Sequence, residues 1–421
     1  MGAQTIGTNW SGNYRYQARA LHQPRTMDEL CALVARAPRL RVLGSRHSFT
    51  SIGDSDELVS LSALDREVSV DREAGTIAVP GDISYAQLAE ILNRHGRALH
   101  NLASLPHISV AGAVATATHG SGDTSGNLAT AVAGIELVTS DGELRFIARG
   151  EDDFDGCVVG LGALGVLTRV VLETEPFYEV RQRVYEGLSW EALFASFDAV
   201  TGRGESVSVF HRFGSRTEQV WVKRRLREDP VIETAVDLFD AASADGPRNP
   251  VLGGDPANCT EQMGVPGPWS ERLPHFRSGF TPSAGEEIQA ELFVPRSEAV
   301  AALTALRALG DQLRPMVLVA EIRTMAADRL WLSPQYGQDT VGLHFTWRRR
   351  QAEVERLMGL VEDVLRPFRA RPHWGKVFTA RAAELEHLYD RMNDFRALRE
   401  RLDPRGAFVN PWLRERILGP A

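Results

Sequence analysis

Cysteine is scarce in this chain, and an excess of positive charge is missing. The three cysteines, Cys31, Cys157 and Cys259, lie far apart in the sequence, so they form neither a disulfide framework nor a metal-binding box. Such sparse cysteine suits a reducing compartment, and we expect a cytoplasmic protein. Acidic residues outnumber basic ones by 55 to 47, which argues against nucleic acid as a partner. Two short basic runs, residues 223–225 and 348–350, are expected on solvated surfaces or in ion pairs.

The sequence also lacks long apolar runs, a signal-peptide pattern, metal-ligand spacings and a nucleophilic-serine motif. No run approaches the roughly 18 apolar residues of a membrane-spanning helix. The first residues lack the pattern of a signal peptide, so we expect no membrane partner. The histidines and cysteines are not at ligand spacings, which predicts no metal site, and there is no G-x-S-x-G elbow for a nucleophilic serine. What remains is typical of a folded protein of two or three domains, with 43% hydrophobic and 24% charged residues among 421.

Helical and extended segments alternate along the chain, which indicates an α+β fold. The apolar spacing predicts helices over residues 27–37, 85–95, 155–161, 298–312, 352–365 and 382–402. Alternation predicts strands over residues 40–43, 58–61, 67–71, 76–79, 168–174, 317–323 and 342–347, and a hairpin over 135–148. The proline-dense segment 242–279 is expected to form a lid or cover, or else a disordered insert.

A loop follows the strand at 40–43 and carries Gly44, Ser45, Arg46, His47 and Ser48. The glycine permits a sharp turn, so the histidine could closely approach a flat ligand. Taken alone, the loop is more simply explained as a histidine capped by its neighbouring serines.

Large side chains nearly vanish between residues 112 and 126, where small and hydroxylated ones dominate. Apolar anchors at Ile108, Val110 and Val114 favour an ordered segment over a flexible linker. The exposed amides of such a segment form a concavity suited to phosphate. A second glycine-rich run, Gly160-Leu-Gly162-Ala-Leu-Gly165, matches G-x-G-x-x-G. A strand follows it instead of a helix, so it is not a dinucleotide-binding crossover.

Two polar pairs lie on otherwise apolar strands. Glu321 and Arg323 share one strand face, and His344 and Thr346 share another, because side chains two residues apart point the same way. Such pairs usually mark the solvent side of a sheet, although two of them could instead line a pocket. Lys376 follows a glycine on what is expected to be a loop entering a strand.

Several stretches together resemble the vanillyl-alcohol-oxidase-type flavoproteins, and most closely the alditol oxidases. The matching segments are Gly44–Phe49, Ala103–Gly112, Thr118–Gly122, Asn258–Trp269, Glu321–Arg323, Phe345–Trp347, His373–Lys376 and Asp403–Asn410. The resemblance covers essentially the whole chain. It implies an FAD-binding domain of two α+β subdomains at residues 1–178 and a substrate-binding cap domain at 179–370. The cap holds an antiparallel sheet and helices, and residues 371–421 return to the first domain.

The resemblance also implies that FAD is joined to the protein by a single covalent bond at His47. Relatives with a second link need a cysteine near residues 101–112, and this chain has none there. The other residues implied to contact FAD are Gly44, Ser45, Arg46, Ser48, Ser104, Ser109, Val110, Ala111, Gly112, Thr116, Thr118, His119, Gly120, Gly122, Gly162, Gly165, Val166, His373 and Asn410. Related enzymes usually have a glycine where this chain has Arg46, and the role of that arginine is left open.

For the substrate, the resemblance implies a polyol pocket formed by Ser104, Glu321, Arg323, Thr346 and Lys376, with His344 beside them. The implied reaction oxidises the terminal hydroxyl of an alditol such as xylitol or sorbitol to the aldose. A hydride passes to flavin N5, and molecular oxygen is reduced to hydrogen peroxide. We expect a monomer in which Lys376, Arg323 and His344 are catalytic. Either Lys376 takes the hydroxyl proton, or Lys376 and Arg323 supply only charge while His344 or water takes it.

Two alternatives stay open from the sequence. The chain could be an aldonolactone oxidase or dehydrogenase of the same superfamily, since Glu321 with Arg323 also occurs in that wider group. From another class, it could be a flavin- or sugar-binding module without catalytic activity.

Overall fold

The computed structural model describes residues 6–226, 238–251, 253–280 and 286–419. The N-terminal part begins with a three-stranded parallel sheet in the order β1-β3-β2, formed by β1 (Ala20–His22), β2 (Leu40–Val42) and β3 (Glu57–Val59). Helix α1 (Met27–Arg36) connects β1 to β2, and its buried face packs on this sheet through Leu30, Leu33 and Val34. The helix begins where the Thr26 hydroxyl accepts a hydrogen bond from the Glu29 amide.

A five-stranded antiparallel sheet follows, in the order β4-β5-β9-β7-β8. Its strands are β4 (Ser69–Asp71), β5 (Thr76–Pro80), β7 (Val132–Val138), β8 (Leu144–Ala148) and β9 (Val166–Glu173). The helices of this region are α2 (Tyr85–Arg94), α3 (Val110–Ala115) and α4 (Phe154–Val158). The short strands β6 (Arg97–Ala98) and β10 (Glu175–Pro176) pair with each other just before the chain leaves for the large sheet.

The large sheet has nine strands, and every pairing in it is antiparallel. The order is β14-β11-β13-β12-β17-β18-β16-β19, with β15 also paired to β11. The strands are β11 (Glu179–Glu186), β12 (Ser206–His211), β13 (Gln219–Arg225), β14 (Ala242–Ser243), β15 (Gly267–Pro268), β16 (Glu287–Pro295), β17 (Val317–Met325), β18 (Thr340–Arg348) and β19 (Arg371–Pro372).

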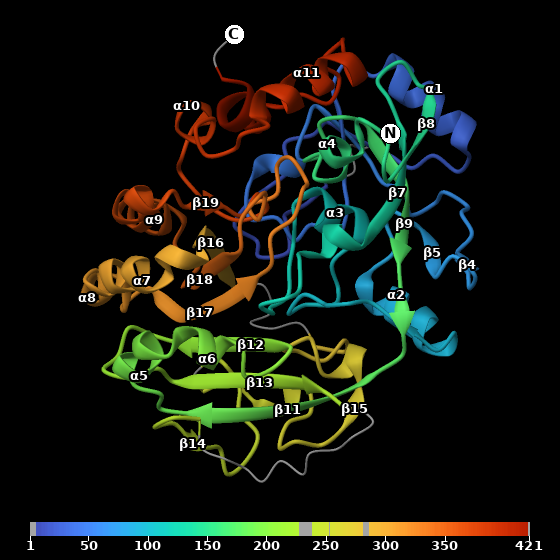
Figure 1. The fold of residues 1–421 in the computed structure, drawn as a ribbon. Coiled ribbons are helices and arrows are strands. Elements are labelled where there is room, and N and C mark those ends of the chain that lie inside the picture. Colours follow the sequence, from blue (N-terminus) through green and yellow to red (C-terminus); the bar gives the residue numbers. More distant parts are fainter. Residues whose placement is uncertain (1–5, 227–237, 252, 281–285, 420–421) are drawn as a thin grey trace.

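Helices α5 (Trp190–Ala195) and α6 (Phe197–Thr201) lie beside β12 and β13 (Figure 1). Helices α7 (Ala299–Arg307), α8 (Gly310–Leu313) and α9 (Gln351–Leu365) lie beside β16, β17 and β18. The C-terminal helices are α10 (Ala382–Leu385), α11 (Met392–Leu402) and α12 (Pro411–Leu413). They lie back against the N-terminal part (Figure 1), where Phe395 and Leu398 join the same buried cluster as Phe154 and Val158. None of the described helices is long and apolar enough to cross a membrane.

Most predicted elements are confirmed, with three corrections, the last of which concerns the segment after Lys376 and is described with the site. The helix expected over 382–402 is broken between α10 and α11. The break places Tyr389 in the core against Trp374, with ring centroids 5.0 Å apart, while Arg371 Nε donates to the Leu388 carbonyl at 2.8 Å. The helix over 298–312 is likewise divided, into α7 and α8.

The second correction concerns side-chain placement. Lys223 does not lie on a solvated surface; it is 1% exposed, because it ends the run of five consecutive buried residues that begins β13. Its neighbour Arg225 forms an ion pair with Glu175 at 2.6 Å, in line with the alternative expected for the basic runs. The segment 242–279 contains β14 and β15, and several of its side chains are buried.

Candidate active site

One cavity of about 1990 Å³, including the space at its mouth, lies between the N-terminal part and the large sheet. Twenty of the residues predicted for the site line it: Gly44, Ser45, Arg46, His47, Ser48, Ser104, Ser109, Ala111, Gly112, Thr116, Thr118, His119, Gly162, Gly165, Glu321, Arg323, His344, Thr346, His373 and Lys376. The loop after β2, the small-residue segment (residues 112–126) and the polar pairs of β17 and β18 therefore converge on a single space, although they are far apart in the sequence.

His47 stands on the loop after β2 and is stacked on Trp10, with ring centroids 5.4 Å apart. Burial lowers the pKa of His47 to about 4, so the ring is neutral at physiological pH. Its Nδ1 is buried and has no hydrogen-bond partner among the residues described. A buried polar atom without a partner is costly and calls for an explanation, and His47 itself lines the cavity.

The residue before His47 has an unusual backbone. Arg46 has a φ of 61°, in the left-handed region that favours glycine. Its side chain turns back along the N-terminal segment, where Nη1 donates to the Ile6 carbonyl at 2.7 Å and the guanidinium lies 6.0 Å from the Tyr16 ring. This arginine therefore supports the loop through the N-terminal segment.

The loop packs closely on the start of α3. The Ser109 amide donates to the Ser45 hydroxyl at 3.0 Å. A Cβ at Gly44 would come 3.0 Å from the Ser109 hydroxyl, and one at Gly112 would come 2.8 Å from it. Both glycines are thus required for this close approach.

Five other residues that the resemblance placed at FAD do not line the cavity: Val110, Gly120, Gly122, Val166 and Asn410. The two valines are fully buried in hydrophobic clusters. The Gly122 amide donates to the Thr324 carbonyl at 2.8 Å and so ties the small-residue segment to β17. The Asn410 amide donates to three carbonyls of the turn at 51–54. Their predicted contact with FAD stays a prediction.

The opposite wall of the cavity is formed by β17 and β18. Glu321 lies directly opposite His344 in the antiparallel register, so the two polar pairs meet on one face. Arg323 and Thr346 extend this face, and all four side chains are buried. The polar faces therefore line a pocket, and the solvent-side explanation is wrong.

Lys376 reaches this wall from the loop after β19, and no strand follows it. The loop is fixed beside His47, because the Phe49 amide donates to the Gly375 carbonyl at 2.9 Å. The Lys376 Nζ contacts His344 Nδ1 at 2.8 Å and Glu291 Oε2 at 2.7 Å. Burial lowers the pKa of Lys376, while the facing carboxylate of Glu291 raises it.

Glu291 was not expected from the sequence. Its side chain is fully buried behind the cavity wall on β16, and Arg323 Nη2 lies 3.1 Å from Oε1. Burial alone would raise the pKa of Glu291, but Lys376, His119 and Arg323 hold it well below its usual value. A signal was present in the sequence, since Glu287, Gln289 and Glu291 alternate with apolar residues, but no strand was predicted there.

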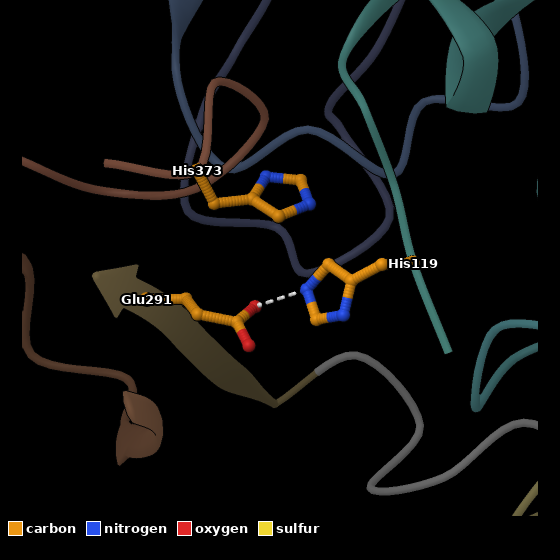
Figure 2. A group of neighbouring side chains, drawn as sticks. All are labelled: His119, Glu291 and His373. Atoms are coloured by element: carbon orange, nitrogen blue, oxygen red, sulfur yellow. Dashed lines mark ion pairs between the residues drawn. The ribbon is translucent and has the colours of Figure 1, made fainter. Parts of the chain in front are cut away.

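Figure 2 shows Glu291 with His119 and His373, whose ligand atoms lie within 4.8 Å of one another. Such a trio can hold a metal ion only if each residue has a free lone pair. The Gly375 amide donates to His373 Nδ1 at 3.1 Å, which leaves Nε2 of that ring protonated. The Glu291 oxygens already face Lys376 and Arg323. The donor set therefore fits a hydrogen-bonded network and not a metal centre.

The hydrogen bonds also fix the state of His344. Because the Lys376 ammonium donates to Nδ1, the ring carries its proton on Nε2, which donates to the Thr346 hydroxyl at 3.1 Å. Burial and the nearby Lys376 lower the pKa of His344 to about 4, so the ring is neutral. In this tautomer the one lone pair of the His344 ring, on Nδ1, is directed at Lys376.

Comparison with known proteins decides the family. The chain matches two family models, one described as an FAD binding domain over residues 18–147 and one as D-arabinono-1,4-lactone oxidase over residues 286–416. An alditol oxidase from Streptomyces sp. is 46% identical over 422 residues, which cover 99% of this chain and 100% of that protein. The chain belongs to the alditol oxidase family.

Lower sequence identity links the chain to a lactone dehydrogenase, and its fold is similar to that of a solved oxidase structure. An L-gulono-1,4-lactone dehydrogenase of Mycobacterium tuberculosis is 28% identical, with 99% of both chains covered. The crystal structure of cholesterol oxidase from B. sterolicum has a TM-score of 0.77 and 14% identity, and it covers 97% of this chain and 96% of that one. This last likeness shows the fold: an α+β flavoprotein fold with a large antiparallel sheet, as the resemblance implied.

The cavity of this alditol oxidase family member fits FAD. His47 lines the same cavity as the close-packed glycines at 44 and 112 and as Gly162 and Gly165. The glycine run at 160–165 is held by Arg41, which donates to the Leu161 and Gly162 carbonyls at 2.6 and 2.9 Å. A backbone-lined cradle of this kind suits a dinucleotide, and it stands directly across from the polar wall.

Proposed function

We propose that the protein oxidises the terminal hydroxyl of an alditol, such as xylitol or sorbitol, to the aldose. FAD, when bound, supplies the hydride acceptor and is reoxidised by molecular oxygen, which yields hydrogen peroxide. The observation that carries this proposal is the set of donors and acceptors on the cavity wall: Ser104, Glu321, Arg323, Thr346 and Lys376. Glu321, Arg323 and Thr346 are buried, and Ser104 and Lys376 are partly buried. A polyol needs such a mixture of donors and acceptors, because every buried hydroxyl without a partner costs binding free energy.

The cofactor is proposed to be attached to His47 through Nδ1, as its single covalent link. The support is the buried, unpartnered Nδ1 together with the neutral state of the ring. Residues 1–178 and 371–421 are proposed to form the FAD-binding domain, and residues 179–370 the cap domain. The absorption spectrum of acid-precipitated protein tests the attachment: a yellow pellet supports it, whereas a colourless pellet with free flavin in the supernatant contradicts it.

Lys376 is proposed to accept the proton of the reacting hydroxyl. In its neutral form it has two N–H donors, which Glu291 and His344 accept, and a lone pair left for the substrate. The lowered pKa of Lys376 supports this role, and Arg323 supplies positive charge beside it. Thr346 and Ser104 orient the polyol chain. A Lys376→Met variant that kept a near-normal rate of anaerobic flavin reduction would exclude lysine from the chemistry.

A second candidate function is oxidation of an aldonolactone. The match of residues 286–416 to the D-arabinono-1,4-lactone oxidase model favours it specifically. Anaerobic bleaching of the flavin separates the candidates when xylitol, sorbitol, L-gulono-1,4-lactone and D-arabinono-1,4-lactone are compared at equal concentration. Bleaching by alditols alone supports the first proposal, and bleaching by lactones alone supports the second. Bound flavin that no compound bleaches would indicate a binding module.

A further inference from the structure

A buried lysine stands behind the substrate wall, outside the set of residues discussed so far. Lys223 on β13 is 1% exposed, and no carboxylate forms an ion pair with it among the described residues. Its Nζ instead contacts the carbonyls of Leu273 and Pro274 and, at 3.1 Å, Nδ1 of His275. An ammonium has three donors, and these three acceptors use all of them.

Two contacts fix the tautomer of His275. Nε2 of the ring lies 2.8 Å from Glu321 Oε1, and an ionised carboxylate oxygen can only accept, so the proton of the neutral ring lies on Nε2. Nδ1 then accepts from Lys223 Nζ, whose pKa burial lowers to about 7. Burial and the nearby Lys223 lower the pKa of His275 to about 4, so the ring is neutral and donates only once. The other oxygen of Glu321 lies 3.5 Å from Arg323 Nε. The Glu321 carboxylate is thus held through one oxygen by His275 and lies near Arg323 through the other.

The segment that carries His275 also touches Ser104, whose hydroxyl accepts from Arg323 Nη1 at 3.4 Å. The amides of His275 and Phe276 approach the Ser104 carbonyl at 3.2 and 3.4 Å. Thr260 fixes this segment, because its amide donates to the His275 carbonyl at 3.0 Å and its hydroxyl to the Pro274 carbonyl at 2.7 Å. His275 and Phe276 both line the cavity. One short segment of the cap therefore holds two of the proposed substrate-binding residues, Ser104 and Glu321, in their relative positions.

We propose that His275 is a positioning residue for the polyol, which aims the Glu321 carboxylate at one substrate hydroxyl, and that Lys223 supports the tautomer on which this depends. The proposal rests on the proposed function in taking an alditol as the ligand. It predicts that replacing either residue weakens binding of the same substrate hydroxyl, the one that donates a hydrogen bond to Glu321.

The first experiment compares His275→Leu, His275→Gln and wild-type holoenzyme in anaerobic stopped-flow reduction of the flavin. The substrates are xylitol and a set of analogues that each lack one hydroxyl. His275→Leu should raise the apparent dissociation constant for xylitol about tenfold, the scale of one hydrogen bond to a charged group. It should not raise that of the analogue lacking the hydroxyl bound by Glu321. His275→Gln keeps an N–H donor and should restore most of the affinity.

A matched control is His211→Leu, because His211 is a second buried histidine of the cap sheet, held among Trp190 and Phe213 and away from the cavity. His211→Leu should leave the apparent dissociation constant for xylitol unchanged. If His275→Leu weakened the binding of xylitol and of every analogue equally, and His275→Gln did not restore it, the proposal would be overturned in favour of a purely structural role.

The second experiment does not depend on substrate. Histidine side-chain ¹⁵N NMR of the holoenzyme at neutral pH should show one neutral, Nε2-protonated ring whose signals vanish in His275→Gln, and Lys223→Met should alter those signals. An Nδ1-protonated or charged His275 would overturn the role given to Lys223. If no alditol reduces the wild-type flavin, the proposed function fails, and this measurement still decides the Lys223–His275 arrangement.

Discussion

Glu291 lies behind the cavity wall, where its carboxylate faces Lys376, Arg323, His119 and His344. It is the counter-ion for Arg323 and for Lys376 in its protonated form. If the substrate is the uncharged polyol proposed above, it cannot neutralise these groups, so the protein must do so itself. Burying two cations without a partner would be far costlier than burying the hydrogen-bonded group observed.

Replacing this carboxylate tests that balance. Glu291→Gln should lower the free energy of unfolding by about 3–5 kcal/mol, the usual cost of removing one partner from a buried ion pair. It should also shift the pH dependence of flavin reduction to lower pH, because Glu291 raises the pKa of Lys376. Denaturant unfolding and anaerobic stopped-flow at several pH values measure the two effects. Glu362→Gln is the control, since Glu362 is a carboxylate on α9 bonded to Thr379, and there the pH profile should not move.

Arg46 is a second residue whose effect can be predicted. Arg46→Gly would relieve a left-handed backbone, a cost of about 1–2 kcal/mol for a non-glycine residue, but it would lose the hydrogen bond to the Ile6 carbonyl. The two effects largely cancel, so the melting temperature should change little. Because the side chain supports the loop from the N-terminal segment, covalent flavin content should persist in the acid-precipitated pellet. A pellet without flavin would show that Arg46 takes part in attachment.

Among the secondary-structure elements, the paired strands decide where the polar residues go. The period of two along β17 and β18 predicts that Glu321 with Arg323, and His344 with Thr346, share faces. The register, with Glu321 opposite His344, then makes one polar surface from two strands. Sequence reasoning reached the first step, whereas the register is a property of the folded sheet and could not be read from either strand alone.

The close packing of the small-residue segment can be tested at Gly120. A Cβ at Gly120 would stand 2.5 Å from the Leu102 carbonyl, a backbone atom that cannot swing aside. Gly120→Ala should therefore destabilise the protein by about 1–3 kcal/mol through overpacking, with loss of bound flavin as the segment shifts. Thermal unfolding and flavin content measure this.

Gly359→Ala is the matched control for that substitution. Nothing lies within 4 Å of the Cβ position at Gly359, which is inside α9. Alanine there should stabilise the protein by about 1 kcal/mol, because it has the higher helix propensity. If Gly120→Ala were as stable as Gly359→Ala, the close packing at 120 would be refuted.

Across the whole molecule, the cavity exists only because two parts of the chain are clamped together. Arg296 holds Asp123 through two bonds of 2.7 and 2.9 Å, and the amide of Gly122 bonds to Thr324. Both contacts join the small-residue segment to the region of the large sheet. These contacts therefore connect the segment that lines one part of the cavity to the sheet that lines another.

The buried histidines predict how the molecule responds to acid. Burial lowers the pKa of His211 to about 3 and those of His275 and His344 to about 4, against an ordinary value of 6.5. Between those values the unfolded chain binds more protons than the folded one, so stability falls as pH decreases from 6.5 to about 4. Melting temperature measured across this range should drop steadily. His211→Leu should flatten the decline, and an unchanged slope in that variant would contradict the assignment.

The sequence by itself determined the fold class, the loop of His47, the small-residue segment and the two polar strand pairs, because each depends on local spacing that any reader of the chain can count. Tertiary structure alone decided that Lys223 is buried, that Glu291 neutralises the wall and that His275 reaches Glu321. Those facts depend on strand register and on which loops dock together. The same tertiary contacts removed Asn410 from the cavity, since its amide is used to hold the turn beside the His47 loop.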